Sequence, residues 1–177
     1  MILRVSHKLG KKIKAAPDMS LPMHEDPFLD WSGHVFRANR VQHIILTNTA
    51  TLYSLVFLGR GLTSPDAYER RVRAELRTFM TSHGYADVYA EHIAADDEGA
   101  AFSKALNQSV IGSVNDMIFR ATLHIEYYGR SLEAVRDRIN TLPMGALDMD
   151  FPSRAFHALS ETTGPHDRGR DGRGRYG

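Results

Sequence analysis

The side chains best suited to chemistry lie along one side of a helix predicted for residues 101–128. Winding this segment at 3.6 residues per turn places Asp116, Arg120 and His124 in a single stripe. The stripe also carries three hydroxyl groups, from Ser109, Ser113 and Tyr127. Arginine offers a phosphate two parallel donors and histidine titrates near neutral pH, so this grouping could recognise a phosphate and transfer a proton.

Other polar residues could complete a site with this stripe. Gly112 lies inside the predicted helix, where glycine costs about 1 kcal/mol relative to alanine, and a ligand or backbone close by would explain that cost. Cationic donors could come from four residues on or near a predicted β-hairpin, namely His34, Arg37, Arg40 and His43. The candidate binding site therefore comprises Ser109, Ser113, Asn115, Asp116, Arg120, His124, His34, Arg37 and Arg40.

Each of these residues also has an ordinary structural interpretation. Asp116 and Arg120 are four residues apart, so they could pair with each other and only brace a solvated helix face. Ser109 and Ser113 are small polar residues that let helices pack closely. The polar stripe is thus either a site or a solvated surface, and the sequence favours the second.

The sequence lacks the recognised catalytic motifs. It contains no GxxxxGK[ST] phosphate loop, no GxGxxG after a predicted strand, no HExxH and no GxSxG. Because cysteine is absent, disulfides, thiolate nucleophiles and Cys-ligated zinc are excluded. The nine histidines are not spaced as a ligand set, and the densest cluster of potential ligands, His24-Glu25-Asp26, lies in a proline-bounded loop. We therefore expect neither a metal nor a cofactor.

The composition is that of an ordinary globular protein. The 177 residues are 42% hydrophobic and 24% charged, with a formal net charge of +1, so the chain as a whole gives no electrostatic case for nucleic acid or a membrane. No apolar run approaches the ~20 residues that span a bilayer, and no secretory signal is evident. We expect a soluble, cytoplasmic protein whose partners are unknown.

Several elements must position the candidate residues. Strands are predicted at residues 2–5, 34–37, 41–47 and 51–57, and the last three form an antiparallel meander because the links between them are short. Helices are predicted for residues 7–14, after the cap Ser6, and from Ser64-Pro65 to Gly84. A further strand is expected at 87–93. Residues 101–142 form a helical hairpin broken at 129–131, and residues 143–159 are irregular.

These elements predict an α+β fold with a small, mainly antiparallel sheet packed against one helix and a C-terminal helical hairpin. Residues 1–160 form a single domain. Residues 161–177 are expected to be a disordered Gly/Arg-rich tail, because they offer almost no apolar side chains. The four arginines of the tail could contact RNA phosphates weakly.

Separated motifs suggest a family. They are Lys8-Leu-Gly-Lys-Lys12, Trp31-Ser-Gly-His34, Asn39-Arg40, Leu46-Thr-Asn48, Ser109-Val-Ile-Gly-Ser-Val-Asn-Asp116 and Leu142-Pro143-Met144. Over about residues 1–156 the chain resembles an uncharacterised bacterial family, domain of unknown function 6933. The resemblance implies a single folded unit in which residues 31–48 and 109–116 are the parts to suspect. It implies no activity, because none is established for the family.

Two classes of function remain open from the sequence. The favoured one is a non-catalytic binding or regulatory module that uses the stripe and the hairpin to hold another macromolecule, such as a protein. The alternative is a small metal-independent hydrolase or nuclease acting on a phosphate-containing substrate, with Asp116, Arg120 and His124 beside Arg37 or Arg40. The sequence is compatible with both an enzyme and a binding module.

Overall fold

A five-stranded mixed sheet organises the fold of residues 1–162, which are the residues that the computed structural model describes. Its strand order is β4-β3-β2-β1-β5, and β1 pairs in parallel with both β2 and β5, whereas β2–β3 and β3–β4 are antiparallel. The strands are β1 (Ile2–Val5), β2 (Asp30–Ala38), β3 (Val41–Asn48), β4 (Ser54–Leu58) and β5 (Ala101–Ser103).

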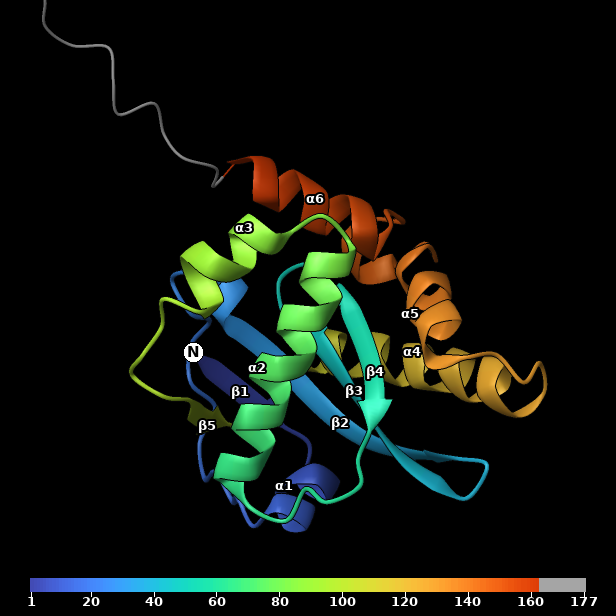
Figure 1. The fold of residues 1–177 in the computed structure, drawn as a ribbon, viewed down its shortest axis with the longest axis horizontal. Helices are drawn as coiled ribbons and strands as arrows, with labels where there is room; N and C mark the ends of the chain where they lie inside the picture. The colour runs from blue at the N-terminus through green and yellow to red at the C-terminus, as the bar shows by residue number, and fades with distance from the viewer. Residues whose placement is uncertain (163–177) are drawn as a thin grey trace, which may run out of the picture.

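Helices cover both faces of this sheet (Figure 1). They are α1 (His7–Ile13), α2 (Pro65–Ser82), α3 (Ala86–Val88), α4 (Gln108–Glu126), α5 (Leu132–Asn140) and α6 (Pro152–Thr162), with short turns η1 (Pro27–Leu29), η2 (Tyr89–Ile93) and η3 (Gly145–Leu147). In Figure 1, α2 crosses in front of the sheet and α4 lies behind it. The architecture is therefore α+β with a layer of helices on each side.

Strand alternation divides the apolar residues between two cores. Ile44 and Leu46 face the core that contains α1, α2 and α6, whereas Ile45 between them faces the core with α4 and α5. All three side chains are fully buried, because helices cover both faces of this interior strand. The sheet thus separates two hydrophobic clusters.

A row of polar side chains crosses the face of the sheet that α4 covers. Ser103, Arg4, Ser32, Thr47 and Ser54 are register partners from β5 through β1, β2 and β3 to β4. Each of them is at most 1% exposed. Hydrogen bonds join Arg4 to Ser103 and Thr47 to Ser54, so neighbouring strands satisfy these buried groups between them.

Several predicted elements are confirmed. The β2–β3–β4 meander is antiparallel, and α2 begins after Ser64 and ends before Gly84. The side-chain oxygens of Ser6, Ser64 and Ser131 each accept a hydrogen bond from the backbone N–H three residues later, which is the capping geometry expected at a helix start. α4 and α5 pack against each other as the predicted hairpin.

The prediction of a mainly antiparallel sheet against one helix and a hairpin is only partly right. β1 and β5 add two parallel pairings, and α1, α3 and α6 add further helices. Parallel pairing of β1 with β2 depends on a long crossover, through α1 and residues 14–29, which short-range patterns do not reveal. The fold class is α+β, with a mixed sheet.

Three local predictions are wrong. Residues 87–93 are helical rather than extended, because Ile93 is buried in the core around α2 as part of the π-helical turn η2. Residues 101–103 form strand β5, so the long helix begins at Gln108, after the cap Asn107. Residues 152–162 form α6 rather than an irregular segment, and Phe156 anchors this helix in the core.

Of the predicted disordered tail, residues 161–177, the first two residues belong to α6, and the residues from 163 onward lie outside the described part of the chain. Within residues 1–162, no helix is both long enough and apolar enough to cross a membrane.

Candidate functional site

Apart from Ser113, the polar stripe on α4 lies on the outer side of the helix. Asp116 and Arg120 are exposed, and within residues 1–162 neither side chain makes an ion pair or a hydrogen bond, so the predicted bracing pair is not formed. Ser113 is buried and donates a hydrogen bond to the Ser109 carbonyl at 3.0 Å. Gly112 has no atom within 4 Å of where a Cβ would lie, so no close approach explains this glycine in the described structure.

His124 is the least exposed titratable member of the stripe. Its Nδ1 atom is buried and has no hydrogen-bond partner within the described chain. Burial, together with the nearby positive charges of Arg130, Arg138 and Arg120, holds the pKa of His124 below its usual value. Its ring lies 5.4 Å from the Tyr128 ring, so this imidazole packs as an aromatic side chain.

The β2–β3 hairpin reaches α4 at the C-terminal end of that helix. Asn39 N donates to Glu126 Oε1 at 2.8 Å, and Asn39 Nδ2 donates to the Ile125 carbonyl at 3.4 Å. Arg37 and Arg40 are exposed, and in the described part of the chain neither bonds to Asp116, Arg120 or His124. The structure therefore does not gather the predicted acid, base and guanidinium groups into one pocket.

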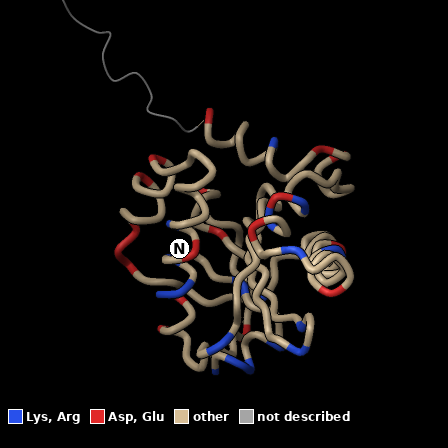
Figure 2. Tube along the Cα trace, turned by 45° about the vertical axis from the view of Figure 1, so that its right-hand side comes forward, with Lys and Arg blue, Asp and Glu red and all other residues tan. Residues whose placement is uncertain are grey.

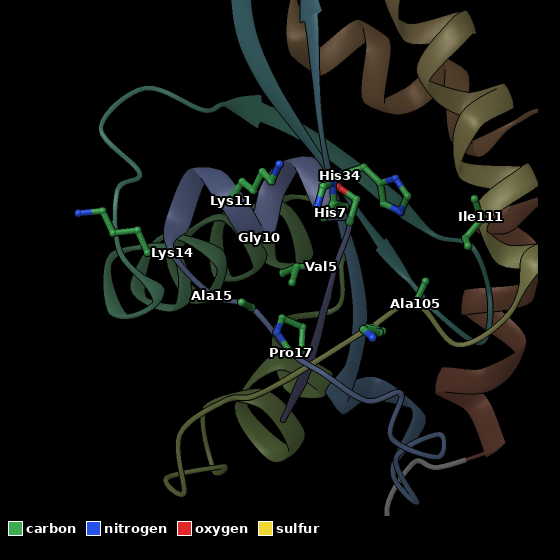
Figure 3. Close-up of a pocket in the computed structure, with 13 residues that line it drawn as sticks. Val5, His7, Gly10, Lys11, Lys14, Ala15, Pro17, His34, Ala105 and Ile111 are labelled. Atoms are coloured by element: carbon green, nitrogen blue, oxygen red, sulfur yellow. The ribbon is translucent and has the colours of Figure 1, made fainter.

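Among the predicted candidates, His34 lines the larger of the two hollows that border α1. This cavity measures about 580 Å³ and lies at the carboxyl ends of β1 and β5 (Figure 3). Carboxyl ends of parallel strands are the usual ligand position in open α/β sheets. Its apolar walls are Val5, Ala15, Ala16, Pro17, Ala105 and Ile111.

Two features hold the walls of this cavity in place. Gly10 in α1 allows residues 15–17 to fold back, because a Cβ on Gly10 would lie 2.6 Å from the Ala15 carbonyl oxygen. The buried Arg4 guanidinium then donates to the carbonyls of Leu21 and Pro22, each at 2.9 Å, and fixes the loop that follows. The sequence therefore positions this concave wall through a glycine and a buried arginine.

Cationic side chains surround the same cavity. Lys11 comes from α1, Lys14 caps the C-terminal end of α1 and Lys104 follows β5, while no acidic residue of the described chain is among the lining residues. Lys104 Nζ donates to the Asp18 carbonyl at 2.7 Å, which fixes its position. Figure 2 shows Lys and Arg concentrated toward the lower end of the molecule, where α1 lies. The cavity thus combines an apolar interior with a positive surround.

His34 supplies the polar group on the sheet side of the cavity. Its side chain is 9% exposed, and it has no hydrogen-bond partner within residues 1–162. Burial lowers the pKa of His34 to about 4, because the charged imidazolium would lose its hydration there. At neutral pH the ring is therefore uncharged and offers one donor and one acceptor nitrogen.

A second, smaller hollow lies on the other side of α1. It measures about 340 Å³ and is lined by Lys8, Lys12, Val35, Phe36, Arg37 and Gln42. Lys12 Nζ donates to Gln42 Oε1 at 2.9 Å. No acidic residue of the described chain is among its lining residues either, so α1 carries positive charge toward both hollows.

The sequence alone indicates part of this arrangement. Four lysines crowd residues 8–14, and this is the visible signal of a basic patch, although such a run is usually a solvated face. The convergence of Lys104, residues 15–17 and His34 on the same cavity depends on the parallel strands. No local pattern in the sequence predicts that these residues meet.

The His24-Glu25-Asp26 cluster has structural partners. Asp26 Oδ1 accepts a hydrogen bond from Phe28 N at 2.9 Å, and Asp26 Oδ2 lies 2.6 Å from His92 Nδ1. His24 Nδ1 accepts from Asp26 N at 3.0 Å. Among residues 1–162, no group of three or more His, Asp or Glu side chains is arranged to hold a metal ion.

Comparison with known proteins gives one match. A family model described as "Domain of unknown function (DUF6933)" matches residues 2–155 of this chain. No curated protein and no solved structure matches.

Proposed function

Because the chain belongs to the DUF6933 family, whose description names no activity, we propose a function from the geometry of the cavity: a non-catalytic binding module. Its ligand is a small organic anion with an apolar body. The observation that carries this proposal is the cavity of about 580 Å³, with apolar walls and three lysines around it. Ligand pockets in proteins commonly have this size and combine apolar walls with a few polar groups.

Each part of the cavity matches one part of such a ligand. The apolar body would cover Val5, Pro17 and Ile111 and remove their surface from water, which contributes roughly 25 cal/mol per Å². The anionic group would lie near Lys11 and Lys14, whose ammonium groups have no hydrogen-bond partner in the described chain.

His34 would orient the bound ligand. Since its ring is neutral at physiological pH, it can donate one hydrogen bond to the ligand without requiring a counter-ion. A pKa of about 4 also makes His34 a poor general base at neutral pH, because efficient bases titrate near the working pH. This supports a binding role over an acid–base role.

The hydrolase alternative has weaker support. It requires Asp116, Arg120 and His124 to border a pocket with Arg37 or Arg40, and neither of the two hollows described above contains the three α4 residues. The hydrolase hypothesis therefore stays a prediction that no observation favours.

A fluorescent probe with the proposed chemistry tests the binding function. 8-Anilinonaphthalene-1-sulfonate joins an aromatic apolar body to a sulfonate, and its fluorescence rises when it leaves water. We expect saturable, stoichiometric binding to the full chain. A Lys11→Ala, Lys14→Ala double variant should weaken this binding by about tenfold or more, which corresponds to about 1.4 kcal/mol.

The matched control removes two positive charges elsewhere. Arg70→Ala, Arg77→Ala changes two exposed residues on α2 that line neither hollow, so probe affinity should stay within twofold of the wild type. Thermal unfolding of all three proteins checks that the probe reports a folded state. Equal weakening in both double variants, or no saturable binding by the wild type, would refute the proposed function.

A further inference from the structure

The smaller hollow between α1 and the β2–β3 hairpin carries its own concentration of positive charge. Lys8 and Lys12 approach it from α1, and Arg37 approaches it from β2. These residues are far apart in the sequence, so the crossover from β1 to β2 brings their charges together. The hollow is separate from the larger cavity, because the two share no lining residue.

The charges in this hollow are not neutralised by the protein. The side chains of Lys8 and Arg37 make no ion pair or hydrogen bond within residues 1–162, and none of the lining residues is acidic. Like charges held close together repel and destabilise the folded state unless a counter-ion joins them. An anion bound in the hollow would remove that repulsion.

One lysine is already held in place. Lys12 Nζ donates to Gln42 Oε1 at 2.9 Å, and Gln42 is the register partner of Arg37 across the β2–β3 hairpin. The amide thus holds the ammonium group at the β3 position that pairs with Arg37. Because Gln42 orients this ammonium group, an arriving anion would meet a lysine that is already in position.

We propose that this hollow is a phosphate-binding site formed by Lys8, Lys12 and Arg37. A guanidinium offers two parallel N–H donors that match two phosphate oxygens, and ammonium groups add point charges around a tetrahedral anion. The volume of about 340 Å³ accommodates a phosphate group together with part of the molecule that carries it. The ligand is therefore a phosphate group, either as the free ion or as a phosphomonoester.

This site stands independently of the proposed function of the larger cavity. Two solution conditions separate the two proposals: inorganic phosphate alone, and inorganic phosphate with the larger cavity saturated by 8-anilinonaphthalene-1-sulfonate. Phosphate should bind equally in both conditions. If the probe fails to bind while phosphate binds, the proposed function fails and the phosphate site stands.

Titration with sodium phosphate at constant ionic strength, followed by the backbone amide NMR signals of the full chain, tests the site. We expect saturable shifts at Arg37 and Gln42, with a Kd on the order of 1 mM for the free ion. Arg37→Gln should weaken binding at least fivefold. Arg40→Gln is the matched control, because Arg40 is exposed on the same hairpin and does not line the hollow.

The variants distinguish a phosphate site from general charge screening. Phosphate binding that Arg37→Gln weakens and Arg40→Gln leaves unchanged supports the site. A second variant, Lys8→Gln, lies on α1 and should also weaken binding, which guards against a local effect of Arg37 on the hairpin. Equal weakening in Arg37→Gln and Arg40→Gln, or shifts that sodium chloride reproduces, would overturn the proposal, since either result indicates general charge screening.

Discussion

Arg4 and Asp30 form a fully buried, bidentate ion pair between the parallel strands β1 and β2. Arg4 Nε lies 2.7 Å from Asp30 Oδ1, and Arg4 Nη2 lies 2.8 Å from Asp30 Oδ2. Both side chains are 0% exposed. The guanidinium also binds the carbonyls of Leu21 and Pro22, so one arginine links two strands to the loop behind the larger cavity.

Removing one partner of this ion pair should lower the stability of the protein. Asp30→Asn leaves the guanidinium buried without a full counter-charge, so we expect the free energy of unfolding to fall by about 3–5 kcal/mol. Chemical denaturation of the variant and the wild type measures this difference. In a double-mutant cycle, Arg4→Met with Asp30→Asn should cost less than the two single variants added together, because no unpaired charge is left. Additive effects would contradict this account.

A second close relationship concerns Gly33 and Tyr68. A Cβ on Gly33 would overlap the Tyr68 hydroxyl oxygen, and this hydroxyl is buried without a partner within the described residues. Gly33→Ala should therefore destabilise the protein by about 2–3 kcal/mol through overpacking. Tyr68→Phe should be neutral or slightly stabilising, since it removes a buried, unsatisfied hydroxyl.

Combining these changes isolates the contact between them. In the double variant Gly33→Ala, Tyr68→Phe, the clashing oxygen is gone, so part of the lost stability should return. Leu9 remains 2.9 Å from the added Cβ, so the rescue should be incomplete. Thermal unfolding of the four proteins measures the effect, and a double variant no more stable than Gly33→Ala would show that the hydroxyl is not the obstacle.

The edge strand β4 is covered by side chains of α5 instead of another strand. Asn140 Oδ1 accepts from Ser54 N at 2.8 Å, and Asn140 Nδ2 donates to the Ser54 carbonyl at 2.7 Å. One turn earlier, Arg136 Nε donates to the Val56 carbonyl at 2.9 Å. These two residues occupy backbone groups that an exposed edge would leave open to pairing with another chain.

We expect Asn140→Ala to lower the free energy of unfolding by about 2 kcal/mol, because it leaves the buried N–H and carbonyl of Ser54 without hydrogen-bond partners. Amide hydrogen exchange at Ser54 should accelerate more than exchange in β2, which lies inside the sheet. Thr141→Ala provides a control at the exposed neighbouring position, with an expected effect within about 0.5 kcal/mol. A control as damaging as Asn140→Ala would point to general weakening of α5.

The sequence predicts those parts of the fold that local patterns control. The β2–β3–β4 meander follows from short links and β-branched residues, and the helix starts follow from capping serines. It does not predict the parallel neighbours of β1, because these pairings depend on a crossover. α6 carries a local signal, Pro152 at the first turn followed by Phe156 and Leu159, although proline and methionine in the preceding residues suggest irregular chain.

The candidate site, too, is predictable from the sequence only where local patterns control it. The four lysines near α1 are visible in the sequence, and His34 is among the predicted candidates. The acid, guanidinium and imidazole on α4 satisfy helical periodicity, yet they lie on an outer face that neither hollow includes. Periodicity identifies which residues share a side, whereas the depth of a cavity depends on elements distant in sequence, such as Lys104 beside residues 15–17.

The buried imidazole of His34 makes stability depend on pH. Its folded-state pKa of about 4 lies below the ordinary value of 6.5, so between these values the unfolded chain binds a proton that the folded chain does not. Stability therefore falls as the pH drops through this window. His34 alone should lower the free energy of unfolding by about 2 kcal/mol between pH 7 and pH 5. His34→Gln cannot titrate, so denaturant unfolding at these two pH values should show a smaller loss in the variant. An equal loss in both proteins would mean that His34 takes up its proton over the same pH range in the folded and the unfolded chain.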